Sequence, residues 1–476
     1  MEDFLLKPTF ETAPSVKALI NIGALFDIPT GFYLKGKYGE SILNGGLGLL
    51  VGVVGTGNVY KSTILHYMGL TAMERIYIAH PTSMSTYDTE VNIQEEALQR
   101  FVDRFNVFKD LDIFRLMIWA ITDKTVYYAN QWYEKLKEYL KNKMDNKSKV
   151  TLETPFLDRD GKSLIKMMVP TFSEVDSFSE FETEDVAKIQ NENELGESGG
   201  NTIHMRQGLA KTRFLMELPS VTMKANHYML LTAQVGKDIQ MASGPIPQAP
   251  VRKLVHLKNG DKIKGVTDKF FFLMSSCWQA VGVSLLIKQD TKTVEYPSSP
   301  DDNKAGDQDL NIVTLRQLRS KSGPSGATIE IIVSQKEGVL PSLTEFHYIK
   351  GMNRFGISGT MQHYNLDLLP EVKLSRTTVR SKIDELPELR RALNITSELC
   401  QMHQYQRHSS VLCTPEELYK DIKELGYDWS VLLKTRGWWT LNNDKQEVPF
   451  LSTLDLLNMR AGTYKPYWLK ETKSKG

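Results

Sequence analysis

The sequence predicts an α/β protein with a mostly parallel central sheet flanked by helices. Residues 44–57 are apolar and rich in glycine, a pattern typical of a buried strand that runs into a tight loop. Apolar side chains then recur at helical spacing over residues 61–75. A strand, a glycine loop and a helix in this order are the usual opening of an α/β unit.

The composition is that of a globular protein. Of 476 residues, 41% are hydrophobic and 24% are charged, with 58 Lys and Arg against 57 Asp and Glu. This near-neutral total excludes binding to nucleic acid through bulk charge alone, so such binding needs a local basic patch. We expect a cytoplasmic protein without a membrane partner, because no apolar run approaches about 18 residues and Met1 is not followed by a basic leader. The three cysteines lack metal-ligand spacing.

The length favours about three domains, and the chain divides into segments of different character. Residues 1–44 form an N-terminal segment, a candidate subunit-contact element. Residues 45–370 form the α/β core, which contains a helix and a hairpin around residues 127–163. From residue 371 to residue 476 the pattern is helical, which predicts a small C-terminal helical domain.

Further strands are expected in the core, where short apolar runs lie between turn residues. These runs are residues 151–156, 163–172, 228–235, 270–287, 308–318 and 329–334. A helix is expected over residues 205–216. Residues 236–269 form a long polar stretch that is rich in lysine and is interrupted by three prolines.

The strongest motif lies between the first strand and its helix: Gly55-Thr56-Gly57-Asn58-Val59-Tyr60-Lys61-Ser62, followed by Thr63. A loop at a helix N-terminus aims backbone N–H groups at phosphate oxygens, and the helix dipole favours their negative charge. Lys61 supplies a mobile cation for the β- and γ-phosphates, and Ser62 can reach Mg²⁺. The segment from Gly55 to Thr63 is therefore a candidate site for a nucleoside triphosphate with Mg²⁺.

Tyr60 departs from the common form of this loop, which has glycine at that position. Where the backbone requires a conformation that favours glycine, tyrosine costs about 1–2 kcal/mol. The alternative interpretation is a glycine-rich turn that Lys61 and Ser62 follow by chance. The apolar strand before it and the helix after it make that alternative less attractive.

The order of this motif and the later ones resembles that of the RecA-type recombinases, and most of all the phage UvsX-type branch. Members of that branch also have an aromatic residue at the position of Tyr60. The resemblance covers about residues 45–350 and implies a RecA-like P-loop core that uses ATP and Mg²⁺, with residues 127–163 as an insertion. It implies that Glu90, which ends the motif Ser85-Thr86-Tyr87-Asp88-Thr89-Glu90, is the general base for the attacking water.

Two further strand ends match positions with catalytic roles in that family. The run from Met167 ends in Asp176, which would orient the water shell of Mg²⁺, although Pro170 and Glu174 interrupt its apolar pattern. Residues 229–234 end in Gln234, which would sense the γ-phosphate. Taken alone, each feature is also compatible with an ordinary polar residue at a strand end.

The family places its DNA-binding loop directly after that glutamine. In residues 236–269 the candidate DNA contacts are basic side chains: Arg252, Lys253, Lys258, Lys262 and Lys264. Cations on a loop suit the phosphate backbone, because binding releases condensed counterions. The stretch has no Phe, Tyr or Trp to stack on bases, so contact independent of base sequence is expected. The alternative is a solvated charged face.

Arg319 and Lys321 resemble the two basic residues that reach the ATP of the neighbouring subunit in RecA-type filaments. They lie in the motif Leu318-Arg319-Ser320-Lys321-Ser322. In this role they would stabilise charge on the transferring γ-phosphate in trans. The alternative is a pair of exposed hairpin cations.

The sequence thus predicts a DNA-dependent ATPase and strand-exchange recombinase that assembles on single-stranded DNA in the host cytoplasm. Further copies of the chain would bind in a filament or ring, and single-strand-binding and loader proteins would be further partners. A hexameric DnaB-like helicase is one alternative, although a loop near residue 55 leaves little room for an N-terminal domain. A non-hydrolysing nucleotide-binding assembly protein is another, which Tyr60, Pro170 and Glu174 keep open.

Overall fold

The computed structural model describes most of the chain between residues 17 and 469. The described ranges are 17–90, 95–109, 118–121, 128–158, 160–192, 200–237, 254–258, 260–266, 269–302, 304–360, 362–405 and 410–469. None of the helices in these ranges combines the length and the apolar character needed to span a bilayer.

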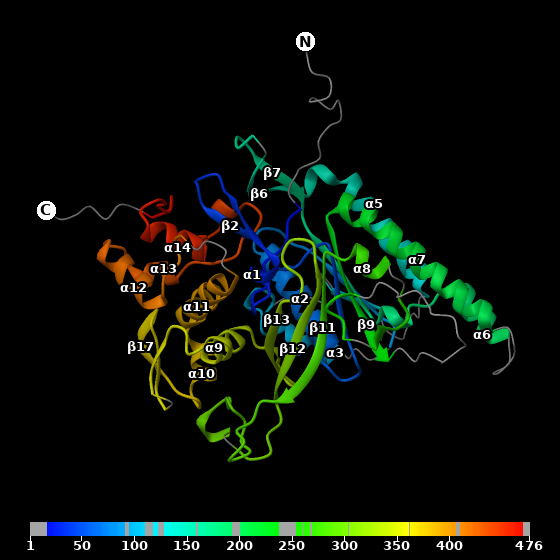
Figure 1. Ribbon diagram of the computed structural model, residues 1–476. Coiled ribbons are helices and arrows are strands. Elements are labelled where there is room, and N and C mark those ends of the chain that lie inside the picture. Colours follow the sequence, from blue (N-terminus) through cyan, green and yellow to red (C-terminus); the bar gives the residue numbers. More distant parts are fainter. Residues whose placement is uncertain are drawn as a thin grey trace, which may run out of the picture.

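A ten-stranded sheet runs through the centre of the described structure (Figure 1). Its strands follow the order β14-β13-β12-β11-β3-β9-β8-β4-β5, and β10 pairs with β9. The strands from β11 to β5 are mutually parallel, whereas β12, β13, β14 and β10 are antiparallel to their neighbours. The bounds are β3 (Leu50–Gly55), β4 (Met84–Asp88), β5 (Ile118–Ile121), β8 (Thr171–Asp176), β9 (His227–Lys237), β10 (Asp261–Ile263), β11 (Ser276–Leu285), β12 (Leu310–Ser320), β13 (Thr328–Ser334) and β14 (Gly338–Val339).

Helices cover both faces of this sheet, so the expected α/β class with a mostly parallel sheet is confirmed. Helix α2 lies on one face, and α5 and α7 lie side by side on the other (Figure 1). The helices are α1 (Asp27–Thr30), α2 (Lys61–Tyr77), α3 (Glu95–Val102), α5 (Ala129–Asp145), α6 (Glu184–Glu192), α7 (Gly200–Ala225), α8 (Lys269–Leu273), α9 (Pro341–Gly351), α10 (Val379–Glu385), α11 (Pro387–Tyr405), α12 (Pro415–Glu424), α13 (Trp429–Leu433) and α14 (Thr453–Arg460).

Smaller elements surround this core. Short 3₁₀ turns occur at Asn106–Phe108, Lys147–Lys149, Phe178–Glu180, Pro300–Asp302 and Asn443–Lys445. Three small antiparallel sheets pair β1 (Phe32–Lys35) with β2 (Ser41–Asn44), β6 (Thr151–Leu157) with β7 (Leu164–Met168), and β16 (Tyr364–Leu366) with both β15 (Ile357–Gly359) and β17 (Leu369–Leu374).

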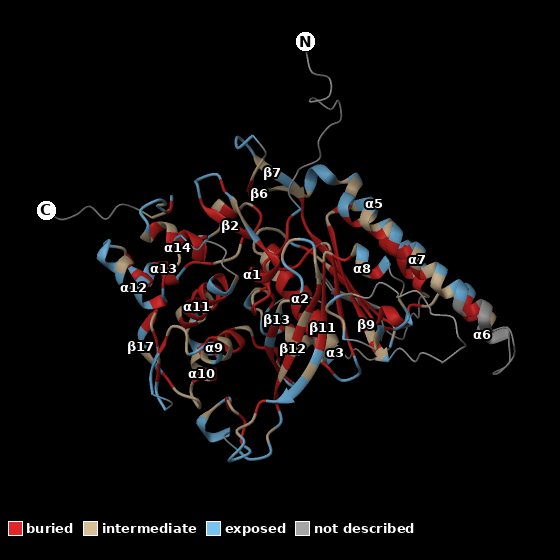
Figure 2. Cartoon of the chain, in the orientation of Figure 1, coloured by how far each residue is buried: buried red, intermediate tan, exposed pale blue. Residues whose placement is uncertain are grey.

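The central strands are buried on both faces. Successive side chains of a strand point to opposite faces, so Leu230 of β9 packs in the cluster around α2 while Leu231 packs in the cluster under α5 and α7. Both leucines are fully buried, and Figure 2 shows the strands between the two helical layers as largely buried. Burial on both faces explains why β3 and β9 contain continuous apolar runs rather than alternating ones.

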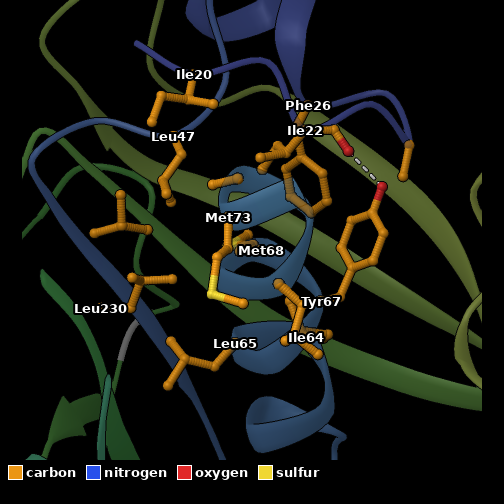
Figure 3. Close-up of a cluster of buried hydrophobic side chains, with 14 of the residues drawn as sticks. Ile20, Ile22, Phe26, Leu47, Ile64, Leu65, Tyr67, Met68, Met73 and Leu230 are labelled. Atoms are coloured by element: carbon orange, nitrogen blue, oxygen red, sulfur yellow. Dashed lines mark hydrogen bonds between the residues drawn. The ribbon is translucent and has the colours of Figure 1, made fainter. Parts of the chain in front are cut away.

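The N-terminal segment packs directly on α2. Ile20, Ile22 and Phe26 lie against the helix in the same buried cluster as Tyr67 and Met68 (Figure 3). The Tyr67 hydroxyl donates a hydrogen bond to the carbonyl oxygen of Ile22. The described part of the segment is therefore tied to the helix that follows the glycine loop.

The C-terminal region is helical from α10 to α14, and its buried side chains join those of earlier elements. Ile28 and Leu43 lie in one apolar cluster with Leu393 of α11 and Leu457 of α14. Trp439 is fully buried, and its indole N–H donates to the carbonyl oxygen of Leu19 at 2.9 Å. The boundary expected near residue 371 stays a prediction.

The structure corrects several predicted boundaries. The strand expected over residues 163–172 is two strands, because Pro170, which has no N–H for a ladder bond, lies in the break between β7 and β8. The strand expected from residue 270 begins only at Ser276, after the short helix α8. The helix expected over 205–216 extends over the whole of α7, and β9 continues past residue 235 because β10 pairs with its end.

Residues 127–163 also contribute to the main core. Trp132 of α5 stacks on Tyr87 of β4, with ring centroids 5.0 Å apart. The hairpin of β6 and β7 follows this helix. The role of the segment as an insertion stays a prediction.

Gly69 of α2 gives a stability prediction, because a Cβ there would lie 2.4 Å from Oε1 of Glu174. We expect Gly69→Ala to lower the free energy of unfolding by about 1–3 kcal/mol through overpacking. Gly208 of α7 is the matched control, since a Cβ there meets no atom within 4 Å. Gly208→Ala should raise stability by about 0.5–1 kcal/mol. Urea unfolding of both variants measures the difference, and equal effects would contradict the close approach.

Candidate functional site

The predicted phosphate-binding and catalytic residues meet at one edge of the sheet, where parallel strands end. Gln234 of β9 lies opposite Gly55 of β3. On the other side of β9, β8 ends at Asp176, which lies opposite Asp88 of β4. The carboxyl edge of such a sheet is where ligands bind in open α/β proteins.

The glycine loop leaves β3 and enters α2 at Lys61. Thr56, Gly57 and Asn58 are exposed, and Asn58 has a positive φ of 55°. A Cβ at Gly55 would lie 2.6 Å from Cγ2 of Val59, whereas one at Gly57 would meet nothing within 4 Å. A side chain at Gly55 would therefore collide with Val59, whereas the loop at Gly57 leaves open space beside the backbone.

The start of α2 offers donors for an anion. No side chain caps it, so N–H groups of the first turn lack a side-chain partner. The Lys61 ammonium donates to the carbonyl oxygen of Thr56 at 2.6 Å and so lies over the loop. Burial lowers the pKa of Lys61, against the opposing effect of the Asp176 and Glu90 carboxylates. Lys61 thus stands within electrostatic reach of both predicted acids.

Tyr60 adopts the left-handed backbone conformation, with φ 59° and ψ 28°. This is the conformation that favours glycine and that we expect to be costly for tyrosine. Its ring packs against the cluster around α2. Its hydroxyl accepts a hydrogen bond from Nδ2 of Asn311 on β12, at 2.9 Å. These contacts hold the tyrosine and offset part of the backbone cost.

Hydrogen bonds join the end of β8 to β9 and to the end of β4. The Thr232 hydroxyl donates to Oδ1 of Asp176 at 2.5 Å, and the Thr89 N–H donates to the Asp176 carbonyl oxygen at 2.8 Å. The Glu90 N–H donates to Oδ1 of Asp88 at 3.0 Å. Asp88 and Asp176 are both buried, while Glu90 is exposed. The structure thus fixes Asp176 and leaves Glu90 open to solvent.

A buried acid–histidine pair lies directly beneath this edge, which the sequence did not reveal. Nδ1 of His66 on α2 is 2.7 Å from Oε2 of Glu174 on β8, and both side chains are buried. Burial opposes a charge on His66, but Glu174, followed by Asp176 and Asp88, outweighs it and raises the His66 pKa. The one sequence signal for this pair is Glu174 itself, a carboxyl that interrupts an apolar strand.

Gln234 contacts both Glu90 and the segment around β10, which follows it in the chain. Its Nε2 is 3.5 Å from Oε1 of Glu90, and its carbonyl oxygen accepts a hydrogen bond from the Lys264 N–H at 2.7 Å. The expectation that β9 ends at Gln234 is wrong, since the strand continues to Lys237. The glutamine still lies level with Gly55, between the acids and β10.

Part of the predicted DNA-binding set lies beside this glutamine. Lys262 and Lys264 are exposed on either side of the buried Ile263, in and just after β10, and Lys258 is exposed in the preceding turn. Because alternate residues of a strand share a face, the first two point away from the core. The other two predicted contacts, Arg252 and Lys253, lie outside the described residues.

Arg319 and Lys321 lie at the opposite edge of the sheet from the loop. Arg319 is level with Cys277, and Cys277 is level with Gly52, three residues before Gly55. The Lys321 N–H donates to the Ser275 carbonyl oxygen, just ahead of β11. At about 3.3 Å per residue, these cations stand about 10 Å or more below the loop of their own chain. The structure does not bring them to that loop.

The residues present fit a magnesium-bound nucleoside triphosphate. The loop is open at Gly57, the helix start is uncapped, and Lys61 is at hand. Among the described residues, no three His, Cys, Asp or Glu side chains could hold a metal ion by themselves. Ser62 and Asp176 would therefore hold Mg²⁺ together with phosphate oxygens, the usual arrangement for this ion.

Comparison with known proteins adds no family assignment: no protein-family model matches the chain, and no curated protein matches it significantly in sequence.

Proposed function

We propose that the chain is an ATP-dependent, single-stranded-DNA-binding recombinase of the RecA type, which hydrolyses ATP and forms a filament with ATP between subunits. The convergence of Lys61, Asp176, Glu90 and Gln234 on one sheet edge carries this proposal. A chance Lys-Ser pair after a turn would not require two acids and a glutamine from three other strand ends to meet it.

Each residue has a role that its environment supports. The loop N–H groups and Lys61 bind the phosphates, and Ser62 and Asp176 hold Mg²⁺, which draws charge from the phosphate oxygens when bound. Glu90, exposed beside the edge, accepts the proton of the attacking water. Asp176 is already fixed by Thr232, so little reorganisation is needed on binding.

Gln234 couples the bound nucleotide to the DNA-binding lysines. Its side chain contacts Glu90, and its carbonyl oxygen holds the backbone of Lys264. A change at the γ-phosphate that moves the glutamine would shift β10 with its exposed lysines. This mechanical link supports coupling between hydrolysis and DNA affinity.

The distance between the loop and the Arg319–Lys321 pair supports assembly. Because these cations stand at the far edge of their own sheet, they can complete a nucleotide site only on another copy. Cations supplied in this way raise phosphoryl-transfer rates strongly.

An ATPase assay with and without single-stranded DNA tests the function. We expect hydrolysis that DNA stimulates, and open helical filaments in electron micrographs with ATP. Closed rings that unwind duplex DNA would instead support the DnaB-like helicase. Nucleotide binding without turnover, even with DNA, would support the non-hydrolysing assembly protein.

Gln234→Ala should separate hydrolysis from its stimulation. Without the side chain, the contact with Glu90 is lost while the backbone bond to Lys264 remains. We expect basal ATPase activity within about threefold of wild type, and the DNA-stimulated increment reduced about tenfold, a loss of about 1.4 kcal/mol in coupling. The exposed Gln289 provides the control, Gln289→Ala. Full stimulation in Gln234→Ala would contradict the link.

A further inference from the structure

A cavity of about 680 Å³ lies along the side of α2 that faces α9 and α11. Of the described residues in the candidate nucleotide site, Thr63 alone lines it. Its volume falls within the range of small-molecule sites. The proposed function makes no use of this cavity.

Three buried carboxyl groups from three different helices line this cavity. They are Asp27 of α1, Glu345 of α9 and Glu398 of α11, with exposures of 7%, 4% and 8%. One amide joins two of them: Nδ2 of Asn394 lies 3.1 Å from Oε1 of Glu398 and 3.5 Å from Oε1 of Glu345. Asp27 interacts electrostatically with both glutamates, so the three acids form one cluster on the wall.

In the described structure, no Lys or Arg donates a hydrogen bond to these carboxyls. Asp27 accepts from the backbone N–H groups of Ile22 and Gly23, at 2.8 and 3.0 Å. Glu398 accepts from the Thr453 hydroxyl at 2.5 Å in addition to the amide. Oε2 of Glu345 has no hydrogen-bond partner among the described residues, although the residue is only 4% exposed and lines the cavity wall.

Five arginines also line this cavity: Arg75, Arg104, Arg390, Arg391 and Arg436. Their hydrogen bonds and ion pairs go to groups other than the three carboxyls. Arg391 donates to Oδ1 of Asn394 and to the carbonyl oxygen of Leu451, both at 2.5 Å. Arg75 pairs with Glu74 at 3.0 Å and lies over the Trp438 ring. Burying a carboxylate without a cation costs free energy. A positively charged ligand in this cavity would therefore be stabilised by the three acids.

We propose that this cavity binds a small aliphatic diamine or polyamine, whose ammonium groups donate to Glu345, Asp27 and Glu398. Apolar side chains suited to methylene groups line the same space: Leu70, Phe101, Phe105 and Val339. A bare metal ion is disfavoured, because no three acidic or histidine side chains in the described residues converge tightly enough to hold one.

Titration of the cluster gives the binding a pH signature. Burial, followed for Glu345 by Glu398, raises the pKa of Glu345 to about 8, and burial raises that of Asp27 to about 7. Burial raises the Glu398 pKa too. Arg391 of α11 and Arg75 and Tyr67 of α2 act electrostatically on the cluster. The other charged residues that line the cavity are Glu74, Arg104, Glu337, Asp384, Arg390 and Arg436. An ammonium group binds the ionised carboxyls, so binding releases protons and strengthens as pH rises from about 6 to 8.5.

Isothermal titration of the full chain with spermidine and with putrescine, without nucleotide or DNA and at physiological salt, tests the proposal. We expect saturable binding that is about tenfold tighter at pH 8.5 than at pH 6, with net proton release in buffers of different ionisation enthalpy. Glu345→Gln, which keeps the shape and the bond to Asn394, should weaken binding about tenfold. Glu371→Gln on β17 is the exposed control and should bind as wild type does.

Three results would overturn the proposal: no saturable binding, affinity independent of pH, or equal affinity for Glu345→Gln and wild type. The pH series uses the unmodified chain, so it decides even where the variant fails to fold. Because the assay contains no ATP or DNA, its outcome is independent of the proposed ATPase.

Discussion

Lys61→Ala is expected to reduce ATP hydrolysis about 10²–10³-fold, equivalent to about 2.7–4 kcal/mol of transition-state stabilisation. The ammonium lies over the loop, where it donates a hydrogen bond to the Thr56 carbonyl oxygen. In the proposed mechanism it would stabilise the charge on the transferring phosphate. Alanine removes this cation and leaves the loop backbone, so nucleotide binding should weaken less than turnover. Steady-state ATPase rates and nucleotide binding by titration separate the two effects.

The matched control is Lys35→Ala, which removes an exposed lysine from β1. It should leave ATPase activity unchanged, which shows that loss of a lysine charge from the surface is not the cause. DNA-stimulated hydrolysis at the wild-type rate in Lys61→Ala would show that this loop does not bind the nucleotide, and it would contradict the proposed function.

The pair His66–Glu174 is expected to be the costliest polar contact to break. Glu174→Ala leaves a buried histidine without its partner and opens a space below the site, and loss of one partner of a buried pair costs about 3–5 kcal/mol. A cycle with His66→Ala and the double variant should give a coupling energy above about 1 kcal/mol. Urea unfolding of the four proteins measures it.

The pH dependence of that coupling has a defined sign. The folded state raises the His66 pKa above its ordinary value of 6.5. The stabilising contribution is therefore complete below pH 6.5 and is lost as pH rises through the folded pKa. The surface pair of the exposed Glu134 and the half-buried Lys137 on α5 is the control and should couple by less than about 1 kcal/mol. Equal coupling at pH 6 and pH 9 would show that His66 is not charged in the folded state.

Loss of the His66–Glu174 pair should also affect the candidate site at the carboxyl edge of the sheet. Glu174 precedes Asp176 by two residues on β8, and His66 follows Lys61 by five on α2. The pair thus ties the helix that begins at the loop to the strand that carries the predicted magnesium ligand. In the Glu174→Ala protein we expect ATPase activity to fall at temperatures where the fold persists.

Local pattern predicted much of the candidate site. The loop from Gly55 to Lys61 could be predicted because a buried strand, glycines and a helical period follow one another within about thirty residues. The polar residue near the end of β9, Gln234, was visible after an apolar run, whereas Glu90 and Asp176 were assigned to strand ends by the family resemblance. The pairing of those ends depends on strand order, which the motifs supported only through a family resemblance.

Other features depend on partners far apart in the chain. His66 and Glu174 are 108 residues apart, so nothing near Glu174 shows why a carboxyl tolerates that buried strand. The cavity carboxyls come from α1, α9 and α11 and meet only when those helices pack. The placement of Arg319 far from its own loop likewise follows from the antiparallel pairing of β12 with β11.

The sequence alone determined the α/β class and the position of the glycine loop at the start of α2, because periodicity and turn chemistry are local properties. The tertiary structure decided where strands end, since Pro170 breaks one predicted strand and β10 extends β9. It also decided which acids face Lys61 and which carboxyls line the cavity. Burial and pairing are set by neighbours in space, and those neighbours come from distant parts of the chain.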